Sequence, residues 1–304
     1  MGEVEHCQID VGHGVELHVA ATGPKDGKPV LLLHGFPELC FSWRKQLEPL
    51  AAAGYRVIAP DNRGYGGSSR PEAIEAYDNA SLTEDVVGLL DHFGYEQAAV
   101  FGHDWGAFLT WHLGLAVPER VAVIGGLSVP AVPRAPAEPL AIMRHKFGET
   151  FYIVWFQEPG VAEAALESDV RRTLSTTKVW TEDWVASDDD PPTPKFMTDE
   201  ELQVYVDAFT ETGFRGGLNW YRNIDRNWHA NAVYEGHTID MPAFFLVGER
   251  DPTNLFMPKE AMDGYVTDLR SVTVLEGAGH WVQQERPDEV NAALLDFLAE
   301  TYPA

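Results

Sequence analysis

The chain has 304 residues, of which 45% are hydrophobic and 23% are charged, and this is ordinary for a globular protein of one large domain or two small ones. Its 47 acidic and 22 basic residues give a net charge of -25, which argues against nucleic acid or an anionic membrane as a partner. The two cysteines, Cys7 and Cys40, imply no disulfide framework. Neither a secretion signal nor an apolar run of transmembrane length is evident, so we expect a cytoplasmic protein.

Short segments rich in apolar and β-branched residues predict buried strands. These segments are 16–20, 30–33, 56–59, 98–101, 121–127, 243–247 and 271–275. Helical patterns lie between many of them. Ser81 and Glu84 have the spacing of a capping box before one helix, and Pro287 is placed to open the last one. This alternation predicts an α/β fold with a mostly parallel sheet that is flanked by helices.

The alternation stops between about residues 130 and 235. This segment has no convincing strand and is rich in aromatic and helix-forming residues. Its aromatic residues include Phe147, Phe151, Tyr152, Trp155, Phe156, Trp180, Trp184, Tyr205, Phe209, Trp220, Tyr221 and Trp228. A helical insertion would form a lid over the carboxyl edge of the sheet, where such sheets bind ligands. We therefore predict a core domain over 1–129 and 236–304 and a helical lid domain over 130–235.

The pentapeptide Gly102-His103-Asp104-Trp105-Gly106 follows a predicted strand and precedes a helix-compatible stretch. Strand, Gly-x-nucleophile-x-Gly turn and helix form the layout of a nucleophile elbow. The strained turn and the close packing of helix on strand require its glycines. A carboxylate at the centre indicates attack on saturated carbon, with an alkyl ester of the enzyme as intermediate.

The ester of Asp104 would need donors for the oxyanion that develops during its hydrolysis. In a nucleophile elbow one donor is the backbone N–H of the next residue, here Trp105. The second comes from the loop after an earlier strand, which reads His34-Gly35-Phe36-Pro37. Proline has no N–H, so Phe36 is the last available donor before Pro37.

A base and an orienting acid complete the predicted catalytic set. His280, in Gly279-His280-Trp281, follows the last predicted strand and is the candidate base. Asp251 follows the preceding strand and would fix the imidazole tautomer and stabilise the imidazolium. Its rivals are Glu249, two residues away, and Asp240, upstream.

Other polar motifs favour structural roles. We expect His34, His103 and His112 to hold the elbow or the strand ends. The segment 61–69 is rich in glycine but lacks the phosphate-loop pattern, so it predicts a shaped turn after a strand. No cluster has metal-ligand spacing, and we predict neither a metal nor a cofactor.

Taken together, these segments make the chain resemble the hydrolase domain of soluble epoxide hydrolases of the α/β-hydrolase fold. The resemblance runs nearly end to end, and it is carried by His34–Pro37, Arg63–Ser69, Gly102–Ala107, Gly279–Trp281 and the lid segments Phe151–Gly160 and Gly213–Asn223. In that family each lid segment supplies one tyrosine whose hydroxyl contacts the epoxide oxygen. The resemblance implies that Tyr152 and Tyr221 have this role here. Tyr205 is the nearest rival, but its spacing from Leu202 and Phe209 favours core packing.

The resemblance implies a cofactor-independent epoxide hydrolase that converts epoxides to vicinal diols with water. The lid aromatics predict an apolar pocket for hydrophobic epoxides. Two alternatives stay open: a haloalkane or haloacetate dehalogenase, because Trp105 could donate to a halide, and a non-catalytic receptor on the same scaffold. A homodimer is possible, and the natural substrate and its enantiomer are open.

Overall fold

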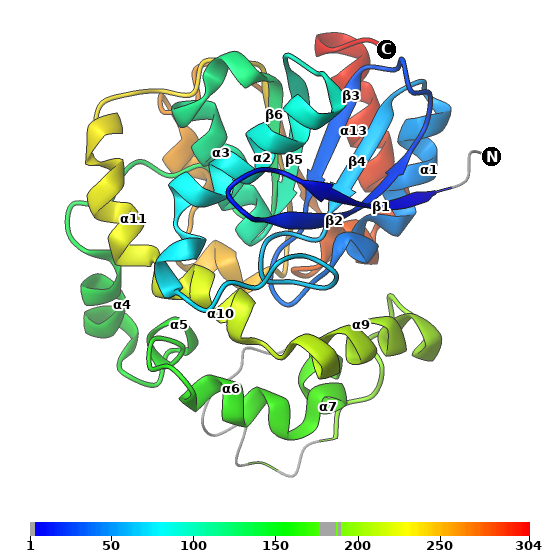
Figure 1. The fold of residues 1–304 in the computed structure, drawn as a ribbon. Helices are drawn as coiled ribbons and strands as arrows, with labels where there is room; N and C mark the ends of the chain where they lie inside the picture. Colours follow the sequence, from blue (N-terminus) through cyan, green and yellow to red (C-terminus); the bar gives the residue numbers. More distant parts are fainter. Residues whose placement is uncertain (1–3, 177–186, 188–189) are drawn as a thin grey trace.

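The computed structural model describes residues 4–176, 187 and 190–304 (Figure 1). Eight strands form one sheet in the order β1-β2-β4-β3-β5-β6-β7-β8. They are β1 (Glu5–Asp10), β2 (Glu16–Thr22), β3 (Pro29–Leu33), β4 (Arg56–Pro60), β5 (Ala98–His103), β6 (Val121–Leu127), β7 (Ala243–Gly248) and β8 (Leu269–Leu275). β2 pairs antiparallel with β1 and β4, and the remaining pairs are parallel. The predicted mostly parallel sheet is confirmed.

Helices cover both faces of the sheet. They are α1 (Arg44–Ala52), α2 (Asn79–Phe93), α3 (Trp105–Ala116), α12 (Val282–Glu285) and α13 (Pro287–Thr301). Alternate residues of β3 belong to different cores: Leu31 and Leu33 pack in the core that includes α2 and α3, whereas Val30 and Leu32 pack in the core with α1 and α13. A strand that is buried on both faces reads as a continuous apolar run, which is why β3 was recognisable in the sequence.

The seven predicted strands are all present. The bounds of 121–127 match those of β6, and the other six segments differ from their strands by one or two residues at one end. The eighth strand, β1, was missed. Five of its six residues are exposed, so it carries no apolar run and no clear alternation. It is held at the sheet edge by its antiparallel ladder with β2.

The start of α2 differs from the prediction. The helix begins at Asn79, and the Asp78 carboxylate caps it by accepting the Ser81 N–H at 2.9 Å. The predicted capping box of Ser81 and Glu84 is therefore wrong, because Ser81 already lies inside the first turn. Pro287 opens α13 as predicted.

Between β6 and β7 the described residues form helices and no strand, and we call residues 128–242 the helical insertion. Its α-helices are α4 (Pro139–Phe147), α5 (Tyr152–Trp155), α6 (Val161–Leu166), α7 (Val170–Ser175), α9 (Asp199–Thr212), α10 (Arg215–Arg222) and α11 (Ile224–Ala230). Most of these green and yellow helices gather along one side of the sheet (Figure 1). Trp180 and Trp184 lie outside the described residues.

Short 3₁₀ turns join several of these elements. They are η1 (Cys40–Trp43), η2 (Ile74–Tyr77), η3 (Pro118–Arg120), η4 (Glu167–Asp169), η5 (Asn231–Tyr234), η6 (Pro252–Leu255) and η7 (Lys259–Met262). In the part of the chain that the structure describes, no helix combines the length and the apolar character needed to cross a membrane.

Candidate active site

Asp104 occupies a strained turn between β5 and α3. Its φ of 52° and ψ of -118° lie outside the regions that L-residues favour. The two flanking glycines allow the turn to be tight. A Cβ on Gly102 would lie 2.1 Å from the Gly106 carbonyl oxygen, and one on Gly106 would lie 2.1 Å from the Leu33 carbonyl oxygen. No larger residue fits at either position.

The loop after β3 lies directly against Asp104. The Phe36 N–H donates to Asp104 Oδ1 at 2.8 Å. This contact depends on Gly35, because a Cβ there would lie 2.4 Å from the Asp104 Cβ. Trp105 is the first residue of α3, where N–H groups have no acceptor within the helix. Within the described residues, the Trp105 N–H makes no hydrogen bond to the Asp104 side chain.

His280 lies between two carboxylates. Its Nε2 is 3.4 Å from Asp104 Oδ2, and its Nδ1 is 3.0 Å from Asp251 Oδ2. Burial alone would lower the pKa of His280, but the two carboxylates outweigh it and raise this pKa well above its ordinary value. Asp251 is 2% exposed, and its Oδ1 also accepts the Thr253 N–H and hydroxyl at 2.9 and 2.7 Å. Burial opposes ionisation of Asp251, yet the His280 charge and these hydrogen bonds hold its pKa at about 2.

The two rival acids have other partners. Glu249 accepts the Gly277 N–H at 3.0 Å, and Asp240 accepts the hydroxyls of Thr238 and Thr267 at 2.8 and 2.7 Å. Of the three candidates, Asp251 is the one that contacts His280.

Two residues that the sequence did not reveal as site residues hold the His280 backbone. The Ser128 hydroxyl donates to the His280 carbonyl at 2.7 Å, and His103 Nε2 lies 2.8 Å from the same oxygen. Ser128 follows β6 with a φ of 68°. Its place at the carboxyl end of a strand was the available signal. His103, which precedes Asp104 in the elbow, therefore contacts the loop that carries His280.

Glu38 belongs to the same hydrogen-bond network. Its Oε2 accepts the Gly35 N–H at 3.0 Å and lies 2.7 Å from His103 Nδ1. Its Oε1 accepts the side-chain amides of Gln283 and Gln284. Glu38 is 1% exposed; burial opposes its ionisation, but His103 and the Gly35 N–H outweigh burial and lower its pKa to about 2. One carboxylate thus ties together three of the loops that form the site.

The expected structural role holds for His34 and His103, but it is wrong for His112. His34 Nε2 accepts the Asn62 N–H at 2.9 Å, so this buried ring fixes the loop after β4. His112 holds neither the elbow nor a strand end. Its ring has no hydrogen bond among the described residues, and it lines a cavity instead.

Tyr152 and Tyr221 come from the helical insertion and face the elbow together. Tyr152 begins α5 and Tyr221 lies near the end of α10, with their ring centroids 6.1 Å apart. The Tyr221 ring packs edge-on against Trp105 with a centroid separation of 4.8 Å. Burial and the Asp104 charge raise the pKa of both phenols, so both keep their protons at neutral pH.

Tyr205 lies elsewhere. It is 3% exposed within α9, and its hydroxyl lies 2.9 Å from Ser42 Oγ and donates to Gln284 Oε1 at 3.3 Å. The prediction that Tyr205 packs in the core is confirmed.

A cavity of about 770 Å³ brings the site residues together. Asp104, Tyr152 and Tyr221 all line it. Most of its remaining wall is apolar and comes from both the sheet side and the insertion. The apolar and aromatic lining includes Trp105, Phe108, Trp111, Leu115, Val129, Ile142, Met143, Phe147, Ile153 and Phe256.

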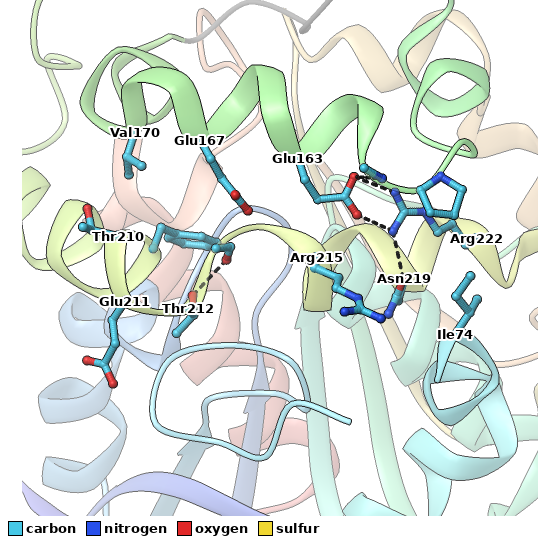
Figure 2. A pocket seen from close by; sticks show the side chains of 14 residues that line it. Ile74, Glu163, Glu167, Val170, Thr210, Glu211, Thr212, Arg215, Asn219 and Arg222 are labelled. Carbon is cyan, nitrogen blue, oxygen red and sulfur yellow. Dashed lines mark hydrogen bonds and ion pairs between the residues drawn. The ribbon is translucent and has the colours of Figure 1, made fainter. Parts of the chain in front are cut away.

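A second cavity, of about 880 Å³, lies among the helices of the insertion (Figure 2). Three of its polar side chains, Glu163, Asn219 and Arg222, are paired with one another. Arg222 donates to both carboxylate oxygens of Glu163 at 2.7 and 2.9 Å and to Asn219 at 3.0 Å. None of the predicted catalytic residues lines this cavity. Its size is therefore no guide to the chemistry.

One cluster has the residue types of a metal site. His18, Cys40 and Asp61 place their ligand atoms within 4.8 Å of one another. Hydrogen bonds already occupy the Asp61 carboxylate, because it accepts the backbone N–H groups of Cys40 and Gly67 and lies 2.7 Å from His18 Nδ1. The arrangement is a hydrogen-bonded junction that shapes the turn after β4.

Comparisons with known proteins agree with this geometry. The model of the alpha/beta hydrolase fold family matches residues 28–287. Epoxide hydrolase A of Mycobacterium tuberculosis is 47% identical, over 98% of this chain and 98% of the relative. The bifunctional epoxide hydrolase 2 of Rattus norvegicus is 38% identical over 97% of this chain but only 56% of its own length.

Solved structures give the same result. Epoxide hydrolase A of Mycobacterium thermoresistibile superposes with a TM-score of 0.94 at 46% identity, covering 99% of this chain and 100% of that one. Potato (Solanum tuberosum) epoxide hydrolase I superposes with a TM-score of 0.91 at 34% identity, covering 98% and 100%. The elbow, the loops around it and these full-length likenesses together show that the chain belongs to the epoxide hydrolases of the α/β-hydrolase fold.

Proposed function

We propose that this protein hydrolyses hydrophobic epoxides to vicinal diols through a covalent ester of Asp104. One observation carries the proposal. Asp104 has a backbone donor and an imidazole on its two oxygens, and it shares a cavity with two protonated phenols. A nucleophile, a base and acids for the leaving oxygen are the three groups that the reaction requires.

Ring opening is the first step. Asp104 Oδ1 is held by the Phe36 N–H, so Oδ2 attacks a ring carbon while the carbon–oxygen bond of the epoxide breaks. Tyr152 and Tyr221 hydrogen-bond the oxygen as it gains negative charge, and one of them transfers its proton. The product of this step is a hydroxyalkyl ester of Asp104. The helical insertion acts here as the lid that carries both acids.

Hydrolysis of the ester is the second step. Esterification removes the Asp104 charge, and this charge is one of the two that raise the pKa of His280. The pKa of His280 is therefore lower in the ester, so the imidazole is free to accept a proton at the moment when a base is needed. Asp251 stays ionised. His280 takes a proton from water, whose oxygen adds to Asp104 Cγ. The Phe36 and Trp105 N–H groups hold the oxyanion, and each such donor is worth about 3 kcal/mol. As the oxyanion collapses, the bond from Cγ to Oδ2 breaks, and Oδ2 leaves with the diol and takes the proton back from His280. The Asp104 carboxyl then gives up its own proton, which restores the tyrosine phenol that was ionised in ring opening.

A single-turnover experiment in oxygen-18 water tests the covalent route. With enzyme in excess over a styrene-type epoxide, the label is expected in the Asp104 carboxylate, measured by mass spectrometry of the peptide that contains it. The diol of that first turnover should be unlabelled, since its new oxygen comes from Asp104. Label in the diol alone would show direct attack of water and overturn the proposal.

The His280→Gln variant separates the two steps. It removes the base but leaves Asp104 and the tyrosines intact, so the ester is expected to accumulate. Intact-protein mass spectrometry then detects one mole of added substrate per mole of enzyme. A variant that forms neither ester nor diol would instead place His280 in ring opening.

A further inference from the structure

His112 is a buried polar residue that lines the cavity shared by Asp104, Tyr152 and Tyr221, which we call the main cavity. Its ring makes no hydrogen bond within the described residues. It is 7% exposed, and its ring contacts Tyr234 edge-on at a centroid distance of 5.7 Å. Across residues 4–176, 187 and 190–304, neither ring nitrogen has a hydrogen-bond partner, and Nδ1 is fully covered. A buried polar group without a partner costs stability, and native proteins contain few of them. Because Nδ1 is covered, Nε2 is the ring nitrogen that a ligand in the cavity can reach.

The position of His112 follows from α3. Trp105, Phe108, His112 and Leu115 recur at intervals of three and four residues along this helix, and all of them line the cavity. The cavity thus runs along one face of α3, with Asp104 at its start. His112 comes eight residues after Asp104, which corresponds to about 12 Å along the helix axis. A ligand attached at Asp104 and extended along α3 would reach the imidazole.

The surroundings of His112 select for an uncharged partner. Burial lowers its pKa to about 4, so the ring is neutral at pH 7, with one nitrogen that donates and one that accepts. The nearby Asp78 carboxylate would repel an anion. Asn79 and Asn227 also line the cavity, and the Asn79 backbone N–H donates to Asn227 Oδ1 at 2.9 Å.

Cationic side chains on the same wall have partners of their own. Arg134 lies 3.8 Å above the Trp228 ring, donates to the Trp228 carbonyl and pairs with Glu235. Lys146 lies over the Phe147 ring at 5.0 Å. Arg134 is thus paired with an acid, and the charged group that acts on the His112 ring is the Asp78 carboxylate.

We propose that His112 forms a second subsite that binds a neutral oxygen of the substrate, a hydroxyl or a carbonyl, about two helical turns from the epoxide ring. The subsite rests on the proposed function, because Asp104 defines where the ring sits. It narrows the substrate class from apolar epoxides in general to long epoxides that carry an oxygen at the far end.

The test compares linear epoxides that differ only at the far end. One carries a hydroxyl about 12 Å from the ring, one carries a methyl group there, and one carries a carboxylate. For the wild type, we expect kcat/KM to be about tenfold higher for the hydroxyl compound than for the methyl compound, which is the effect of one added hydrogen bond. The carboxylate should be no better than the methyl group. A preference for the carboxylate, or equal rates with hydroxyl and methyl, would overturn the subsite.

Variants of His112 assign the preference to its ring. His112→Leu keeps the volume and removes the polar atoms, so kcat/KM for the hydroxyl compound should fall to that of the methyl compound measured with the same variant. Its melting temperature should equal or exceed that of the wild type, because an unpartnered buried group is removed. His112→Gln retains a donor and an acceptor and should restore part of the preference. Phe108→Leu, one turn earlier on the same cavity face, is the control and should change both rates by the same factor.

Binding of the diol products separates this inference from the proposed function. Calorimetry with the diols of the hydroxyl and methyl compounds needs no turnover. A tighter Kd for the hydroxyl diol, lost in His112→Leu, supports the subsite even when no epoxide is hydrolysed. Epoxide turnover with identical Kd values and no hydroxyl preference would leave the proposed function standing and overturn the subsite.

Discussion

The two sides of the main cavity are built by different means. Asp104 lines the cavity on one side, and we call it the floor together with Phe36, His280 and Asp251, which support it from outside the cavity lining. The floor is set by backbone contacts and buried hydrogen bonds, such as the 2.8 Å bond from Phe36 to Asp104. The roof, formed by Tyr152 and Tyr221, is set by aromatic packing. The Tyr221 ring lies 5.1 Å from Phe156 and 5.4 Å from Phe36 between centroids. The geometry of the floor therefore depends on individual hydrogen bonds, whereas the geometry of the roof depends on the packing of several aromatic rings.

The largest expected effect is on the roof. Replacing Tyr152 and Tyr221 together with Phe keeps the ring packing and removes both acids, so ring opening should slow by about 10⁴-fold. Stopped-flow measurement of ester formation checks this. Tyr205→Phe is the matched control, since its hydroxyl contacts Ser42 and Gln284 in the core, and its rate should stay within about twofold. A double variant that still opens the ring at the normal rate would mean that another group supplies the proton.

The next effect is on the floor. Gly35→Ala places a methyl group where only 2.4 Å separates it from the Asp104 Cβ, so the Phe36 N–H must move away from the carboxylate. Loss of one oxyanion donor costs about 10²- to 10³-fold in kcat. Gly114→Ala in α3 is the control, because the three atoms nearest a Cβ there are side-chain atoms of Ile124, Met241 and Ile239, at 3.0 to 3.5 Å. Steady-state kinetics decides the matter, and equal activities would remove Phe36 from the oxyanion site.

A third prediction concerns the effect of the Asp104 charge on the pKa of His280. Asp104 raises the pKa of His280, so Asp104→Asn should lower this pKa. Titration of the imidazole by NMR measures the shift. Asp296→Asn, an exposed change on α13, should leave the pKa where it is. An unchanged or higher pKa of His280 in Asp104→Asn would contradict the proposal that esterification of Asp104 lowers this pKa.

The smallest effect concerns stability. The pKa of Glu38 is lowered from 4.5 to about 2, so its ionisation stabilises the fold fully above the unfolded value and this contribution is lost as pH falls through that range. The Glu38→Gln side chain does not ionise, so the variant lacks this pH-dependent contribution to the free energy of unfolding. Its free energy of unfolding should fall less steeply than that of the wild type between about pH 5 and 2.5, by about 2 kcal/mol in total. Urea unfolding across this range tests it, with exposed Glu289→Gln as control; parallel slopes in Glu38→Gln and wild type would argue against a buried carboxylate anion.

The floor was largely predictable from sequence and the roof was not. The strands of a parallel sheet are continuous apolar runs, and the elbow and the loop at Phe36 lie within a few residues of strand ends, so local patterns reveal them. Tyr152 and Tyr221 were predicted from the family resemblance alone. Tyr152 lies 25 residues after the end of β6 and Tyr221 lies 22 residues before the start of β7, on helices whose aromatic spacing also fits core residues such as Tyr205.

The supports of the floor escaped sequence reasoning for a different reason. Ser128 and His280 are 152 positions apart, and Glu38 and Gln284 are 246 positions apart, so no local pattern links them. β1 was missed because its side chains are exposed. The start of α2 was misplaced because Asp78 and Ser81 are both good capping residues, and only the backbone conformation distinguishes them.

The route of the chain around the insertion has an evolutionary consequence. The insertion begins after β6 and ends before β7, and these strands are neighbours in register, with Leu127 beside Leu246. A recombination event that exchanges residues 129–242 replaces both phenols and much of the apolar wall in one step, and leaves the nucleophile, its base, Ser128 and the α3 face in place. New substrate ranges are therefore reachable in this architecture by swapping a contiguous gene segment, without rebuilding the hydrolytic machinery.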